Sequence, residues 1–152
     1  MKKNINYDLF NEVLLECEEH LHFLDTKKDT AHGKQSIYNH VITVALACYE
    51  YAIRKNKKVA LRELTRGALL HDYYQYDWHV LKGRKRFHGF RHPFIALHNA
   101  KLEFDLTERE MDIIAKHMWP LTLIFIPKYK ESFYVMWFDK VCAIREMRKR
   151  SK

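Results

Sequence analysis

The stretch Gly67-Ala68-Leu69-Leu70-His71-Asp72 decides the fold, because it closes an apolar run with a histidine and a carboxylate side by side. On a straight helix, consecutive side chains diverge by about 100°, so two neighbours reach one ion most easily where the helix ends. Imidazole nitrogens and carboxylate oxygens are ligands for a borderline divalent metal. The stretch therefore predicts a helix end that carries metal chemistry.

Four more residues of the same ligand types lie at long intervals along the chain. They are His40, His92, His117 and Asp139. Together with His71 and Asp72, these residues supply more ligands than one ion needs, which indicates two ions. Asp72 can bridge the two ions through its two carboxylate oxygens. A single histidine on an apolar helix face is more often a packed core or surface residue. That interpretation applies to His20, His22, His32 and His98.

In this order, the six candidates resemble the HD superfamily of metal-dependent phosphohydrolases. The resemblance runs from Asn39-His40-Val41 through Leu69-Leu70-His71-Asp72 to Phe138-Asp139-Lys140 and covers roughly residues 36 to 146. His92-Pro93 and His117 resemble the two extra histidines of the dinuclear branch, with His88 as an alternative to His92.

The resemblance implies a site for two divalent transition-metal ions. The candidate metals are Fe, Mn, Co, Ni and Zn. One ion is expected to be held by His40, His71, Asp72 and Asp139. The other is expected to be held by Asp72, His92 and His117.

The resemblance further implies hydrolysis of a phosphate ester of a nucleotide or small phosphorylated metabolite. A water shared by two such ions has its pKa lowered from 15.7 to about 7 and would attack phosphorus as hydroxide. Asp72 is the central catalytic residue in this scheme, and His79 or His88 would protonate the leaving group. The residues expected to hold phosphate oxygens are Arg91 and Lys140, or Lys82 and Arg86 of a basic loop.

A departure from the superfamily pattern narrows the range of expected substrates. Many HD phosphohydrolases have a lysine three residues after the aspartate, where this chain has Gln75. The Gly-Tyr-Pro signature of the cyclic-dinucleotide phosphodiesterase branch is also absent. Degradation of cyclic di-GMP is therefore disfavoured.

Two other functions fit parts of the pattern. Some HD-fold proteins that resemble inositol oxygenase hold two irons with a similar ligand set and activate dioxygen. A basic nucleic-acid-binding module with a relict site is the second alternative, because the net charge is +8 and the pI is near 9.4. Such a charge attracts phosphates of any kind, so nucleic acid is a possible but not a favoured partner.

Length, composition and the absence of repeats predict one all-α domain over residues 1–152. The resemblance implies that this domain is a compact HD-domain bundle of about six helices. The first helix is expected to run from Tyr7 to His20. The other five are expected to begin at Ser36 as N-cap, near Leu61, at the His92-Pro93 pair, at the Thr107 capping box and near Ser132.

Cysteine usage and the N-terminus bear on location. Three cysteines without CxxC spacing are expected to be reduced packing residues. No secretory or membrane-spanning run is found, so a cytoplasmic location without a membrane partner is expected.

Overall fold

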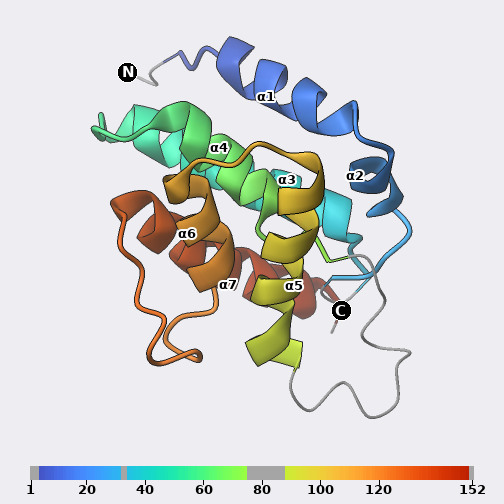
Figure 1. The fold of residues 1–152 in the computed structure, drawn as a ribbon. Helices are drawn as coiled ribbons and strands as arrows, with labels where there is room; N and C mark the ends of the chain where they lie inside the picture. The colour runs from blue at the N-terminus through green and yellow to red at the C-terminus, as the bar shows by residue number, and fades with distance from the viewer. Residues whose placement is uncertain (1–3, 32–33, 75–87, 151–152) are drawn as a thin grey trace.

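The computed structural model describes residues 4–31, 34–74 and 88–150. Within these ranges the chain forms helices and no named strand, which confirms the predicted all-α fold (Figure 1). The elements are α1 (Asp8–Glu18), α2 (Leu21–Asp25), α3 (Ile37–Arg54), α4 (Leu61–Leu70), α5 (His88–Glu103), α6 (Glu108–Lys116) and α7 (Lys130–Arg150). None of the described helices has both the length and the apolar character that crossing a bilayer requires.

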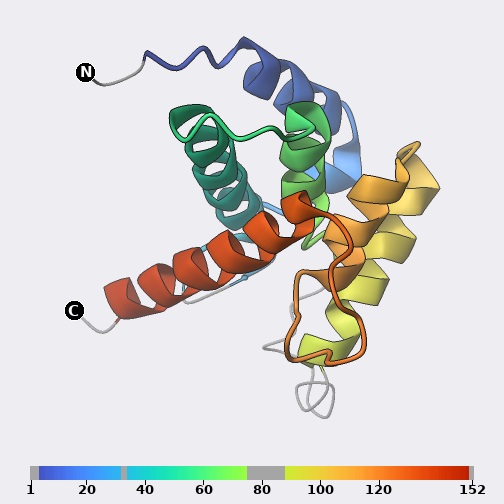
Figure 2. The ribbon, with the colours of Figure 1, turned by 90° about the vertical axis from the view of Figure 1, so that its left-hand side faces the viewer.

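Helix α4 lies at the centre of the bundle. It contacts α1, α3, α5, α6 and α7, and six of its ten residues are buried. Figure 2 shows α7 crossing beside α3 and α6, while α5 lines the outer side of α6. The C-terminal ends of α4 and α6 therefore open toward the same interior region, enclosed by α3, α5 and α7.

Buried polar contacts fix α6 against its neighbours. Thr107 and Glu110 form the predicted capping box at the start of α6. The Glu110 carboxylate also accepts hydrogen bonds from Arg66 Nε and Nη2 of α4, each at 2.8 Å. Two residues later, Asp112 accepts hydrogen bonds from Ser132 Oγ at 2.6 Å and from Lys128 N at 2.9 Å. These contacts set the register of α6 against α4 and α7.

The N-terminal segment forms two helices where one was predicted. Helix α1 ends at Glu18, and His20 adopts an extended conformation that caps α2. The His20 ring lies 4.2 Å from the Phe104 ring and its Nδ1 lies 3.7 Å from Glu103 Oε2. We attribute the break to this packing against the end of α5, which a local apolar pattern does not reveal.

Helix α5 begins earlier than predicted, at His88, so that Pro93 and His92 lie within it. The prediction used the rule that proline favours the first helical position. In the structure the turn before Pro93 packs closely on the segment after α6, where a Cβ at Gly89 would lie 2.8 Å from Leu121 Cδ2. The rings of Phe94, just after the proline, and Phe125 lie 4.9 Å apart. This packing stabilises helical backbone ahead of Pro93, although proline cannot donate to the carbonyl four residues before it.

A substitution at Gly67 tests the contact between α4 and α6. A Cβ built at Gly67 lies 2.6 Å from Ile113 Cδ1 and 3.0 Å from its Cγ2. Overpacking costs about 1–3 kcal/mol and outweighs the gain of about 1 kcal/mol in helix propensity. We predict that Gly67→Ala lowers the free energy of unfolding in urea, and that adding Ile113→Val, which removes Cδ1, restores part of it. An unchanged or raised stability in Gly67→Ala alone would contradict this packing.

Candidate metal centre

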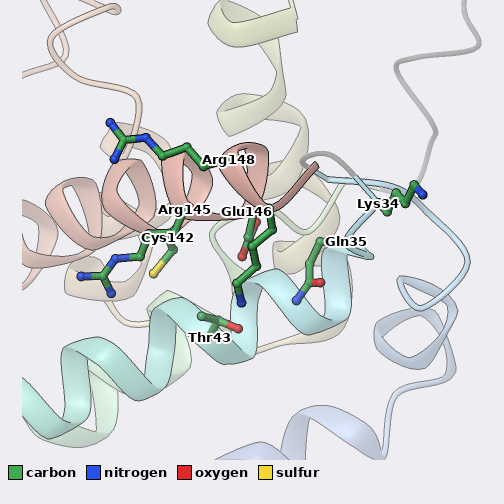
Figure 3. Close-up of a pocket in the computed structure, with 8 residues that line it drawn as sticks. Lys34, Gln35, Thr43, Cys142, Arg145, Glu146 and Arg148 are labelled. Atoms are coloured by element: carbon green, nitrogen blue, oxygen red, sulfur yellow. The ribbon is translucent and has the colours of Figure 1, made fainter. Parts of the chain in front are cut away.

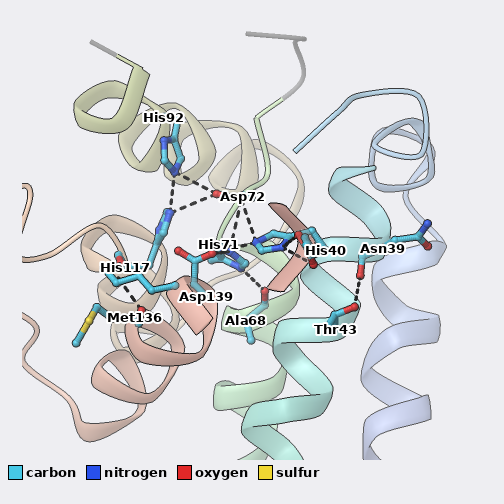
Figure 4. A network of polar contacts seen from close by, with 12 residues as sticks. Asn39, His40, Thr43, Ala68, His71, Asp72, His92, His117, Met136 and Asp139 are labelled. Carbon is cyan, nitrogen blue, oxygen red and sulfur yellow. Dashed lines mark hydrogen bonds and ion pairs between the residues drawn. The ribbon is translucent and has the colours of Figure 1, made fainter. Parts of the chain in front are cut away.

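Two histidines occupy equivalent positions at helix ends. His71 is the C-cap of α4, and His117 is the C-cap of α6. His71 Nδ1 donates to the carbonyl of Ala68 at 2.6 Å, and His117 Nδ1 donates to the carbonyl of Ile114 at 2.8 Å. The last carbonyls of a helix lack partners within it, so these bonds satisfy the backbone and fix the tautomer of each ring. Both rings therefore direct Nε2 into the interior (Figure 4).

A third histidine is oriented by a carboxylate. His40 of α3 is fully buried, and its Nδ1 lies 2.9 and 3.1 Å from the two carboxylate oxygens of Glu146 on α7. Its Nε2 lies 3.0 Å from Asp139 Oδ1, about two turns earlier on the same helix. A carboxylate on the distal imidazole nitrogen is the usual support of a metal-binding histidine.

Asp72 stands between two groups of nitrogens. Its Oδ2 lies 3.7 Å from His40 Nε2 and 3.6 Å from His71 Nε2. Its Oδ1 lies 3.1 Å from His92 Nε2 and 3.3 Å from His117 Nε2. Each oxygen of this one carboxylate thus belongs to a different ligand group.

The two groups contain all six predicted ligands, and every one is buried. Within each group the ligand atoms lie within 4.8 Å of one another. The first group contains His40, His71, Asp72 and Asp139, and the second contains Asp72, His92 and His117. This buried cluster can hold metal.

The donor chemistry fits a metal ion. His71 Nε2 is buried and has no hydrogen-bond partner among the described residues, and its nearest acidic oxygens are 3.5 and 3.6 Å away. A buried polar atom without a partner costs about 1–3 kcal/mol, which a metal–nitrogen bond would remove. The Nε2 atoms of His92 and His117 lie within hydrogen-bond distance of each other, at 2.8 Å, and both lie close to Asp72 Oδ1, so they converge on one place.

Charge within the cluster is strongly coupled. Burial opposes ionisation of Asp72, but the charge on His71 and the nearby imidazoles of His117 and His92 hold the pKa of Asp72 well below its usual range. Burial likewise opposes protonation of His40, but Asp139 and Glu146 raise the pKa of His40 to about 10. Burial and the neighbouring His71 and His92 lower the pKa of His117. The carboxylates are therefore ionised and His117 is neutral, which are the forms that bind metal.

Among the other predicted site residues, the structure describes Lys140, Arg91 and the backbone of His88. Lys140 Nζ donates to the carbonyls of His117 at 3.0 Å and Met136 at 3.4 Å. Arg91 is exposed on α5 next to His92. His88 is the first residue of α5, and its side chain is not described. Outside the described residues lie His79, Lys82 and Arg86.

Glu146 is the residue that sequence reasoning missed. It follows Asp139 by seven residues on α7, which places both on one face of the helix. That spacing was a usable signal, but its histidine partner lies 106 residues away. Glu146 also forms part of the wall of a pocket of about 490 Å³ between α3 and α7, as Figure 3 shows. The basic residues of this pocket are Lys34, Arg145, Arg148 and Lys149.

Comparison of the chain with protein-family models, with characterised proteins and with solved structures gives no match. The buried ligand cluster is therefore the feature that bears most directly on function.

Metal binding is predicted to strengthen as pH rises, because His40 must lose the proton on Nε2 before that atom can bind an ion. With a His40 pKa of about 10, this group remains protonated through the neutral range. The apparent affinity should then rise by about tenfold per pH unit from this group alone. Calorimetry in buffers of different ionisation enthalpy measures both the affinity and the protons released.

Glu146→Gln serves as the matched variant. The amide oxygen can still accept from His40 Nδ1, but the negative charge that raises the His40 pKa is removed. The pH dependence of metal binding should therefore shift to lower pH. Affinity that is independent of pH in both proteins would show that His40 is not a ligand.

Proposed function

We propose that the protein is an HD-type, metal-dependent phosphohydrolase that cleaves a phosphate ester of a nucleotide or small phosphorylated metabolite. The division of the Asp72 oxygens between two nitrogen groups carries the proposal. Pairs of metal ions that share ligands are typical of phosphatases and nucleases. When bound, such ions supply a water of lowered pKa and neutralise charge on the phosphate oxygens.

The chain's own residues hold the ligands in place. His40, His71 and Asp139 would complete the first site, and His92 and His117 the second. Their Nε2 atoms are aimed before any ligand arrives, since the bonds at Nδ1 of His40, His71 and His117 are already made. Preorganisation of this kind reduces the reorganisation needed during the reaction.

The cation that holds phosphate is a separate question. Lys140 is half-buried, burial lowers its pKa, and its ammonium is bonded to the His117 carbonyl. In our proposal Lys140 therefore positions His117 at the end of α6. Arg91 is exposed on α5 and shares a shallow pocket with Phe90 and Phe94, so its expected role in holding phosphate stays a prediction. Proton donation to the leaving group by His79 or His88 remains a prediction.

The test is phosphate release from nucleoside monophosphates and small phosphomonoesters by protein loaded with manganese or zinc. We predict that Asp72→Asn lowers kcat by more than about a hundredfold, because even outer partners of metal ligands affect activity by 10–100-fold. Asp105→Asn makes the same chemical change at an exposed residue outside the cluster and should retain activity.

Two results would reject the hydrolase. One is the absence of phosphate release from the whole panel by protein shown to contain metal. The other is oxygen uptake that depends on iron, which would instead support the dioxygen chemistry of the related di-iron proteins.

A further inference from the structure

The segment between the C-cap of α6 and the start of α7, residues 118–129 and here called the α6–α7 loop, exposes a run of large apolar side chains. The exposed residues are Leu121, Leu123, Ile124, Phe125 and Ile126. Leu123 is 74% exposed and Ile124 is 82% exposed, values close to those of an extended chain. Single exposed apolar residues are ordinary, but a contiguous group marks an interaction surface.

The first turns of α5 extend this surface. The exposed rings of Phe90 and Phe94 line a shallow pocket of about 290 Å³ together with residues 121–125. Gly89 permits this close approach, because a Cβ there would lie 2.8 Å from Leu121 Cδ2. Figures 1 and 2 both show the loop projecting beyond the ends of α6 and α7, beside the start of α5.

This surface is distinct from the metal centre. Phe90 and Phe94 each lie two residues from His92, and two helical residues correspond to about 200° of rotation. His92 is buried toward the cluster, whereas both phenylalanines are exposed. The apolar surface therefore faces away from the candidate reaction site and needs an occupant of its own.

The charge around the surface limits what that occupant can be. The sequence contains no aspartate or glutamate from residue 88 to 102 or from residue 113 to 130. Exposed Lys128 and Lys130 lie at the end of the loop. The half-buried aromatic residues Trp119 and Tyr129 bracket the apolar run. Side chains with one apolar and one polar end are typical of the interface between a bilayer and water.

These observations favour an anionic lipid surface over a second copy of the chain. A second copy would offer these lysines Glu108, but that carboxylate already lies 3.4 Å from the Tyr129 hydroxyl, whereas an anionic lipid surface presents many free negative headgroups. Anionic headgroups would instead neutralise the lysines while the loop side chains enter the region of the acyl chains.

We propose that the α6–α7 loop and the start of α5 form a peripheral docking site for anionic membranes. No membrane partner was predicted from the sequence, because no secretory or membrane-spanning run is found in it. A peripheral contact requires neither of them. The site would hold the protein at a lipid surface while leaving the face of α5 that carries His92 turned inward.

Co-sedimentation with vesicles of phosphatidylcholine, with and without phosphatidylserine, tests the docking site. The wild-type protein should bind the vesicles that contain phosphatidylserine. Leu123→Glu with Ile124→Glu should weaken this binding by more than tenfold. Each substitution removes an apolar side chain that would enter the bilayer and adds a negative charge that the anionic headgroups repel. Lys128→Gln with Lys130→Gln should weaken it by about fivefold per lysine.

The matched control is Leu21→Glu with Leu102→Glu. These leucines are 77% and 71% exposed, lie on α2 and at the other end of α5, and undergo the same change of net charge. A basic protein binds anionic vesicles through general attraction, and this control measures that contribution. Helical circular dichroism should be the same in all variants, since every substituted residue is exposed.

Three outcomes would overturn the proposal. The wild-type protein could fail to bind vesicles of either composition. The loop variant and the control could lose binding equally, which would indicate general attraction alone. A dimer without vesicles that Leu123→Glu with Ile124→Glu dissociates would identify a second copy as the occupant.

Discussion

The burial of one carboxylate, that of Asp72, between four imidazoles is the constraint on which the rest of the structure depends. A buried charge without partners is strongly destabilising. The helices that supply the imidazoles must therefore all end beside the Asp72 carboxylate or pass close to it. His40 and His71 face one oxygen, and His92 and His117 face the other. The arrangement of α3, α4, α5 and α6 around the cluster satisfies this requirement, and it also creates two adjoining ligand groups.

The helix ends explain how the imidazoles are aimed. At the C-caps of α4 and α6, a histidine ring satisfies the carbonyl three residues earlier and thereby turns its other nitrogen inward. The same bond thus serves the backbone and the candidate site. Arg66, Glu110 and Asp112 hold α4, α6 and α7 in register, so the two caps meet near Asp72. Stability of the bundle and geometry of the cluster are consequently difficult to separate by mutation.

Local patterns predicted much of this arrangement. The Thr107 capping box and the helix that ends at His71 depend on neighbouring residues, and the structure confirms both. Long-range packing decided the rest. The pattern at Pro93 placed the start of α5 too late, because it does not reveal that Gly89 and Phe90, ahead of the proline, pack on the α6–α7 loop. Glu146 escaped notice because only the fold brings it to His40.

The most direct test of the account is the metal content per chain, measured by elemental analysis after purification without chelators and reconstitution with manganese or zinc. The account predicts two ions in the wild-type protein and one in the His92→Ala His117→Ala variant, which keeps the first ligand group intact. Anomalous scattering from crystals would locate each ion at one oxygen of Asp72. A wild-type protein that holds one ion, with unchanged content in the variant, would contradict the shared-carboxylate site.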